Sequence, residues 1–225
     1  MNCSPVLDLW LKGQTEAIGD RAFSNDPEIV ALLGRSTIEG FMAGGILPVI
    51  KHLPGHGRAN VDSHADLPHV GAKRRDLAAT DWLPFKANAH APFGMTAHIL
   101  FQDLDPTACA TQSASIVDDI IRQEIGFQGT LFSDDLSMEA LGGTLGERAA
   151  AARQAGCDLA LHCNGKLDEM TAVLDAAGPL EGQALARFEG SLKQRQGPEP
   201  FDRQTGEEKL YHLLGDQPLS QKAAS

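Results

Sequence analysis

ILPVIKHLPGHG, residues 46–57, is the stretch that decides the fold. Its first half, Ile46 to Ile50, is an apolar run of the kind that forms buried strands in parallel sheets. A lysine, a histidine and then a Pro-Gly-His-Gly turn follow where that strand would end. Lysine seldom ends a core strand without a partner, so Lys51 either pairs with an acid or binds an anionic or hydroxyl-rich ligand. We therefore expect a strand over 46–53 with functional groups, Lys51 and His52, at its carboxyl end.

The same alternation of an apolar strand and a helix recurs along the chain. Asp26 and Pro27 form a helix start, and Gly44-Gly45 stop the helix. The apolar face of that helix is expected to consist of Ile29, Leu32, Leu33, Phe41 and Met42. Further helices are predicted at 75–88, from Ser115 to Gly126, and at 146–155, 166–176 and 181–195. The predicted strands are 3–9, 46–53, 93–100, 129–136 and 157–164.

Five parallel strands covered by helices fit either an open doubly wound sheet or a (β/α)8 barrel. The open sheet usually carries a glycine-rich turn after its first strand, and none follows residues 3–9. Polar residues instead follow every strand, as in a barrel whose strands converge on one mouth: Asp8, Lys51-His52, His98, Asp134-Asp135 and His162-Asn164. The expected fold class is α/β, an incomplete TIM-type (β/α)8 barrel of about five βα units. We expect a catalytic domain over 1–196 and a polar C-terminal tail over 197–225.

Composition excludes several classes of function. A net charge of −11 without a segregated basic patch argues against nucleic acid or an anionic membrane as a partner. No apolar run approaches the ~20 residues that span a bilayer, and the first residues lack a signal-peptide pattern. None of the four cysteines is in a CxxC pair, so a zinc site is not expected and reduced thiols are favoured. A cytoplasmic protein is the expectation.

Two carboxylates and a histidine are the candidates for chemistry. Asp134 ends the strand over 129–136, where a carboxylate can attack an electrophilic carbon. Asp135 either joins it or caps the following turn. In Asp62-Ser63-His64, alternate side chains point the same way, so Asp62 can orient His64 as a general acid/base. An exposed loop histidine beside a turn-forming aspartate is the alternative.

A metal site is not expected from the histidines. His52 and His56 are spaced i, i+4, but the Pro-Gly between them prevents the helix that would aim both at one ion. His56 therefore fits a role in structuring the loop. His98 fits either the site or a buried structural position.

The motifs KHLPGHG…DSH and FSDDLSM together resemble the β-N-acetylhexosaminidases of glycoside hydrolase family 3, in particular the cytoplasmic bacterial type that recycles peptidoglycan. SPVLDL, AIGDRAFSNDP, TAHI and AGCDLALHCN extend the similarity over most of residues 2–165. The resemblance implies a (β/α)8 barrel and a retaining double displacement without metal or cofactor. It implies Asp134 as nucleophile, His64 as general acid/base with Asp62 as its partner, and Arg21, Lys51 and His52 as sugar-holding residues. The implied substrate is a terminal β-linked N-acetylglucosamine on an anhydro-muropeptide.

The resemblance begins at what would be the fourth barrel strand, so strands 4 to 8 are expected here. The first three βα units would be absent, which predicts a fragment or a misplaced gene start with much reduced activity. The intact family enzyme is expected to be a monomer, whereas the exposed edges at 3–9 and 157–163 invite association. Two other functions stay open: a sugar-binding remnant without turnover, and a metal-dependent barrel hydrolase.

Overall fold

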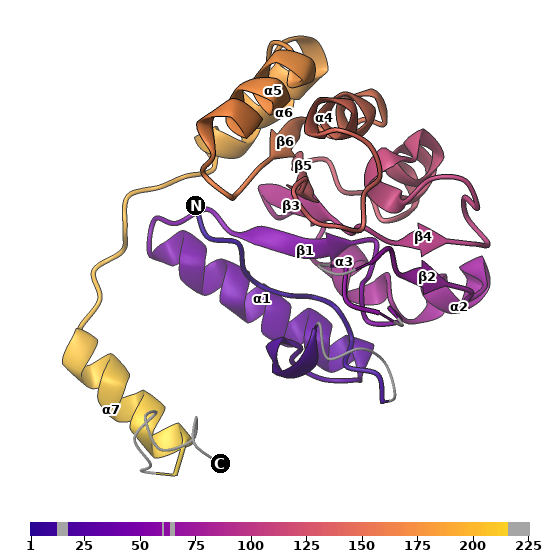
Figure 1. The fold of residues 1–225 in the computed structure, drawn as a ribbon. Helices are drawn as coiled ribbons and strands as arrows, with labels where there is room; N and C mark the ends of the chain where they lie inside the picture. The colour runs from indigo at the N-terminus through magenta and orange to yellow at the C-terminus, as the bar shows by residue number, and fades with distance from the viewer. Residues whose placement is uncertain (13–17, 60, 64–65, 216–225) are drawn as a thin grey trace.

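The structure, a computed structural model, describes residues 1–12, 18–59, 61–63 and 66–215. Strands and helices alternate along the chain, and the strands gather into one central parallel sheet (Figure 1). The strand order β1-β3-β5-β6 follows the chain, as it does in a barrel. These strands are β1 (Val49–Leu53), β3 (Phe93–Thr96), β5 (Thr130–Asp135) and β6 (Leu159–Leu161). A separate parallel pair consists of β2 (His69–Val70) and β4 (Leu100–Phe101).

The predicted strand over 3–9 is not a regular strand, although it runs beside β1. Two isolated parallel bridges join Asn2 to Pro48 and Val6 to Lys51. The Leu7 amide donates to the Lys51 carbonyl at 2.8 Å. The pairing is interrupted between these two bridges, where Pro5 has no N–H to donate to a ladder. Residues 2–7 therefore occupy the position of a fifth strand without its continuous hydrogen bonds.

Most helices form where the pattern predicts them. The predicted helix over 75–88 is instead two short helices, because Pro84 opens a second helix and lacks the N–H that a continuous helix requires. The predicted strand over 93–100 ends at Thr96, and Leu100 belongs to β4. The helices are α1 (Pro27–Ala43), α2 (Arg74–Ala79), α3 (Leu83–Ala87), the π-helix η3 (Ile116–Glu124), α4 (Leu145–Gln154), α5 (Leu167–Ala177), α6 (Gly182–Lys193) and α7 (Arg203–Leu213), with 3-10 turns η1 (Gly19–Arg21) and η2 (Ala110–Gln112).

Helix α1 begins as predicted but buries a different face. The Asp26 side chain accepts a hydrogen bond from the Glu28 amide at 2.8 Å, which caps the helix. The prediction of the apolar face was wrong for Ile29, Leu32 and Leu33, which are exposed, whereas Phe41 and Met42 of that face are half-buried and Met42 packs against the core. The buried positions are instead Val30, Gly34 and Ile38, spaced i, i+4. A Cβ on Gly34 would lie 2.3 Å from Leu7 Cδ2, so the helix packs too closely on residues 2–7 for a larger side chain.

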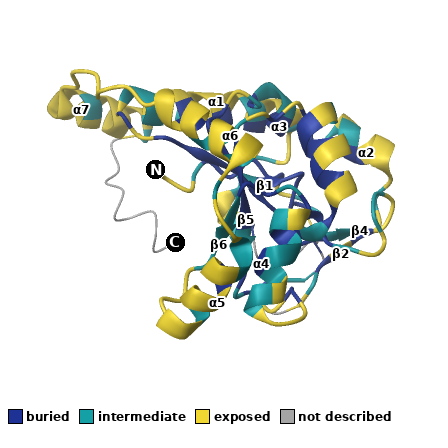
Figure 2. Cartoon of the chain, turned by 90° about the horizontal axis from the view of Figure 1, so that it is seen from above, coloured by how far each residue is buried: buried dark blue, intermediate teal, exposed yellow. Residues whose placement is uncertain are grey.

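Apolar side chains cover both faces of the sheet. Ile50 and Leu131 point into the main core, which lies between the sheet and the helices. Their neighbours Val49 and Phe132 point to the other face, as the alternation of a strand requires. There they join a smaller cluster with Phe188 of α6, and Figure 2 shows the buried strands between more exposed helices. The outer surfaces of α1 and α5 are largely exposed (Figure 2).

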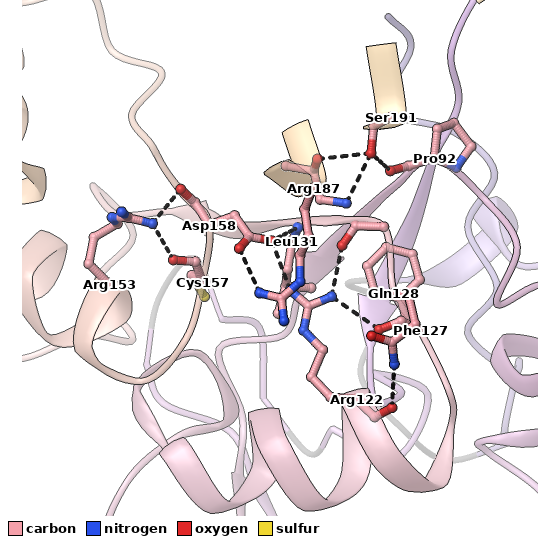
Figure 3. A network of polar contacts seen from close by, with 12 residues as sticks. Pro92, Arg122, Phe127, Gln128, Leu131, Arg153, Cys157, Asp158, Arg187 and Ser191 are labelled. Atoms are coloured by element: carbon pink, nitrogen blue, oxygen red, sulfur yellow. Dashed lines mark hydrogen bonds and ion pairs between the residues drawn. The ribbon is translucent and has the colours of Figure 1, made fainter. Parts of the chain in front are cut away.

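A buried ion-pair network ties η3 and α6 to the amino ends of β5 and β6 (Figure 3). Asp158 accepts from Arg122 at 2.8 Å, from Arg187 at 3.0 Å and from the Leu131 amide at 2.8 Å. Ser191 of α6 donates to the Pro92 carbonyl at 2.6 Å. The end of the sheet opposite the polar strand ends is therefore held by charge-assisted hydrogen bonds.

The central sheet is open within the described residues. β6 pairs with β5 on one side, and no described strand pairs with its other side or with the outer side of residues 2–7. The two edges predicted to be unpaired are therefore unpaired in the described chain. Helix α7 lies away from the sheet in Figure 1 and buries none of its residues. The division into 1–196 and 197–225 stays a prediction, and no described helix is long and apolar enough to span a bilayer.

Candidate active site

Polar side chains gather where the parallel strands end, as the sequence predicts. Lys51 and His52 belong to the last half of β1, and Asp134 belongs to the end of β5. Asp8 follows the segment paired with β1, and His98 follows β3. Because all these strands run in the same direction, their carboxyl ends meet at one edge of the sheet.

A small polar cavity of about 150 Å³ opens at this edge. Four of the predicted site residues line it together: Arg21, Lys51, His52 and Asp134. The remaining lining residues are His56, Ser63 and Met138. Asp62 lies directly beside the lining residue Ser63 but does not itself line the cavity. His64 lies outside the described residues, so the predicted Asp62–His64 dyad stays a prediction.

Asp134 is the carboxylate of the cavity. Its side chain is 16% exposed, and Oδ1 accepts a hydrogen bond from the Asp135 amide at 2.8 Å. Its Oδ2 lies 3.9 Å from His52 Nε2. Burial raises the pKa of Asp134, but the neighbouring imidazoles of His52 and His98 and the Asp135 amide outweigh burial and lower the pKa below its usual value. Asp134 is therefore ionised at neutral pH, as a nucleophile requires.

Asp8 lies behind the cavity wall and organises the loop after β1. It is 1% exposed and accepts hydrogen bonds from His52 Nδ1 at 2.7 Å and from the His56 amide at 2.6 Å. Burial raises its pKa, but His52 and His56 outweigh burial, and the pKa of Asp8 is lowered. The sequence shows Asp8 only as a strand-end carboxylate. Its contact with His52 joins residues 44 positions apart, so no local pattern predicts it.

His56 has the structural role that its loop position indicates. It is 3% exposed, and its Nε2 lies 3.2 Å from the Ser63 hydroxyl oxygen. Burial, with His52 nearby, lowers its pKa to about 4, so the imidazole is neutral at neutral pH. This contact joins the turn after β1 to the loop that leads towards His64.

His98 and Asp135 serve to hold the strand ends in place. His98 Nε2 donates to the Asp135 carbonyl at 3.0 Å, and its Nδ1 lies 2.7 Å from the Thr111 hydroxyl. Burial lowers the pKa of His98, so it is a buried, neutral, structural histidine. Asp135 accepts from the Ser137 amide at 3.0 Å and from the Cys163 amide at 3.2 Å. Of the two alternatives for Asp135, the capping role is the one that the geometry supports.

The described residues do not assemble a metal centre. Nowhere in 1–12, 18–59, 61–63 and 66–215 do three His, Cys, Asp or Glu side chains lie where they could hold one ion. The metal-dependent alternative therefore has no group of ligands among these residues.

Comparison with known proteins places the chain in a family. The family model described as "Glycosyl hydrolase family 3 N terminal domain" matches residues 1–192. A beta-hexosaminidase of Alkalilimnicola ehrlichii is 44% identical over 165 residues, which cover 72% of this chain and 47% of that protein. One of Thiobacillus denitrificans is 41% identical, covering 83% of this chain and 54% of that protein.

Solved structures agree with the sequence matches. A glycoside hydrolase family 3 beta-N-acetylglucosaminidase from Paenibacillus has a TM-score of 0.83 at 29% identity, covering 92% of this chain and 44% of that one. NagZ from Neisseria gonorrhoeae, solved with N-trifluoroacetyl-D-glucosamine, has a TM-score of 0.76 at 36% identity, covering 87% and 56%. The chain thus spans about half the length of the curated relatives it matches. Its open parallel sheet is part of a TIM-type barrel, and the chain belongs to glycosyl hydrolase family 3.

Proposed function

We propose that this site serves the hydrolysis of a terminal β-linked N-acetylglucosamine glycoside with retention of configuration. The observation that carries the proposal is the position of Asp134. It is an ionised, partly exposed carboxylate at a strand end, in a cavity shared with Arg21, Lys51 and His52. Relatives named beta-hexosaminidase, and a relative solved with an N-acylated glucosamine, support the class of sugar.

In the proposed first step, Asp134 Oδ2 attacks the anomeric carbon of the sugar. The oxygen–carbon bond of a glycosyl-enzyme forms while the bond to the leaving oxygen breaks, and His64 donates a proton to that oxygen. In the second step, His64 takes a proton from water, which attacks the anomeric carbon and releases Asp134. Asp62 would hold the His64 imidazole in the orientation and tautomer that this exchange needs.

Arg21, Lys51 and His52 are proposed to hold the sugar hydroxyls. All three line the cavity with Asp134, and together they supply several N–H donors and, in a neutral imidazole, one acceptor. Hydroxyl-rich ligands need such a mixture, because each sugar hydroxyl both donates and accepts. The described part of the wall is polar enough for a sugar and offers no large apolar surface.

The test is turnover of a chromogenic N-acetyl-β-glucosaminide, with Asp134→Ala as the matched control. Retention predicts that proton NMR detects the β-anomer of the released sugar first. A 2-fluoro or similar slow glycosyl donor is expected to label Asp134, which peptide mass spectrometry locates. Turnover that survives unchanged in Asp134→Ala, or a label on another residue, contradicts the proposed mechanism.

A second candidate is sugar binding with little or no turnover. The observation that favours it is the open sheet, since the described strands leave two edges unpaired and span about half of the relatives' length. A site wall contributed by other strands would then be needed for catalysis. Calorimetric titration with N-acetylglucosamine separates the candidates, because binding without turnover supports the second and full turnover by a monomer refutes it.

For the natural substrate we propose an anhydro-muropeptide of peptidoglycan recycling, acted on in the cytoplasm. The support is the resemblance of KHLPGHG and FSDDLSM to the peptidoglycan-recycling type. Comparing kcat/KM for an N-acetylglucosaminyl anhydro-muropeptide and for a chitin disaccharide tests it. A preference for the chitin fragment contradicts the proposal.

A further inference from the structure

Asp8 is a buried carboxylate surrounded by N–H donors from the end of β1 and from the turn that follows it. The His52 amide donates to both carboxylate oxygens at 3.2 Å, and the His56 amide donates to Oδ1 at 2.6 Å. His52 Nδ1 lies 2.7 Å from Oδ2. Asp8 does not line the cavity, so any effect on a ligand must pass through these two histidines.

The contact between Asp8 and His52 determines where the imidazole proton lies. An ionised carboxylate only accepts hydrogen bonds, so a ring nitrogen 2.7 Å from it must carry the proton. In the neutral ring, the other nitrogen, Nε2, then has a lone pair and no proton. His52 lines the cavity, and its Nε2 is on the side of Asp134 Oδ2.

The distance from His52 Nε2 to Asp134 Oδ2 is 3.9 Å, which is too long for a hydrogen bond. An unprotonated nitrogen facing a carboxylate has no direct attraction to it. A hydroxyl group placed beside them can instead donate its proton to Nε2. The pair of Asp134 Oδ2 and His52 Nε2 is therefore arranged for a ligand hydroxyl that donates its proton to the nitrogen.

We propose that Asp8 is a positioning residue that holds the His52 proton on Nδ1, so that Nε2 accepts a hydrogen bond from a sugar hydroxyl next to Asp134. The sugar as ligand rests on the proposed function; the position of the proton does not. The competing role for Asp8 is purely structural, in which its bonds to the two amides keep the loop folded and the His52 tautomer has no consequence.

Asp8→Asn distinguishes these roles. The new amide oxygen still accepts from the backbone N–H groups, but the amide nitrogen has protons and must donate to His52 Nδ1. The His52 proton then moves to Nε2, and the acceptor facing the cavity becomes a donor directed at Asp134. The same substitution in a serine-protease triad leaves the geometry intact and produces the wrong tautomer.

Long-range proton–nitrogen NMR on chain containing labelled histidine reads the tautomer at pH above 8 without any turnover. His52→Gln assigns the His52 signal by its disappearance. We expect the proton on Nδ1 in the unaltered chain and on Nε2 in Asp8→Asn. Asp158 is a buried carboxylate at the opposite end of the sheet, so Asp158→Asn is the matched control, in which His52 is expected to keep its proton on Nδ1. A proton on Nε2 in the unaltered chain overturns the proposal even if the variants do not fold.

Binding measures the consequence for the ligand. N-acetylglucosamine is expected to bind about 10-fold to 100-fold more weakly to Asp8→Asn, because one good hydrogen bond is lost and a buried donor is left unpaired. In a His52→Gln background, Asp8→Asn should weaken the binding of N-acetylglucosamine little further, because Asp8 acts through His52. Equal weakening in both backgrounds overturns the positioning role. If the chain binds no sugar but shows the expected tautomers, the proposed function fails while the placement of the proton stands.

Discussion

Asp158→Ala is the substitution for which the structure allows the sharpest estimate of lost stability. Asp158 is 2% exposed and lies between two arginines, with Arg122 Nη2 at 2.8 Å from Oδ2 and Arg187 Nη1 at 3.0 Å from Oδ1 (Figure 3). The Leu131 amide donates to the same carboxylate at 2.8 Å. Truncation to alanine therefore removes the acceptor of three hydrogen bonds at once.

The magnitude follows from what stays buried. The Arg122 side chain is only 7% exposed, and removing one partner of a buried ion pair typically costs about 3–5 kcal/mol. Arg122 keeps its hydrogen bonds to the carbonyls of Phe127 at 3.0 Å and Gly129 at 2.7 Å, so it is not left without acceptors. The Arg187 side chain is 19% exposed and can reach water more easily. We therefore expect the lower part of the range, a loss of about 3 kcal/mol in the free energy of unfolding.

Urea unfolding followed by circular dichroism measures this loss. Glu207→Ala is the control, because its partner Arg203 is highly exposed and such surface pairs contribute about 0–1 kcal/mol. The network lies at the end of the sheet opposite the cavity, so folded Asp158→Ala should bind N-acetylglucosamine with unchanged affinity. A loss below about 1 kcal/mol for Asp158→Ala would refute the reasoning that this network holds the amino ends of the strands.

Three further predictions concern the loop, pH and the open edges. In Gly57→Ala the new Cβ would lie 2.3 Å from the Leu9 carbonyl oxygen. We therefore expect a loss of about 1–3 kcal/mol in the free energy of unfolding by urea and weaker sugar binding. An unchanged midpoint of urea unfolding contradicts this prediction. The folded pKa of His56 is about 4 against 6.5 unfolded, so the unfolded chain binds more protons between these values. The free energy of unfolding should fall by up to about 3 kcal/mol as pH falls from 6.5 to 4, and this dependence on pH should be weaker in His56→Gln. The same pH dependence in His56→Gln and in the unaltered chain would refute the lowered pKa of His56. Unpaired strand edges and exposed apolar groups such as Leu174, 71% exposed, predict concentration-dependent association in sedimentation, reduced in Leu174→Glu; a monomer at all concentrations contradicts it.

Local pattern predicts the elements whose signals lie within a few residues. Asp26 and Pro27 begin α1. The apolar face of α1 was predicted wrongly, because Ile29, Leu32 and Leu33 are apolar yet exposed. The choice of Gly34 as the contact depends on how closely the helix approaches Leu7, and only packing decides that distance.

The candidate site shows the same division between local and long-range information. Asp134, Lys51 and His52 are predictable because polar groups after buried strands converge in any parallel arrangement of this kind. The structural roles of His98 and Asp135 cannot be predicted in this way, because their partners Thr111 and Cys163 come from other segments of the chain. The same residue types would serve chemistry or structure equally well until those contacts are known.

The sequence by itself determined the alternation of strands and helices, the polar strand ends and the family motifs, since each depends on the order of neighbouring residues. The tertiary structure alone decided that Asp8 accepts a hydrogen bond from Nδ1 of His52, 44 residues away. The physical reason is that strand pairing brings side chains within 3 Å of one another without leaving a local pattern in the sequence.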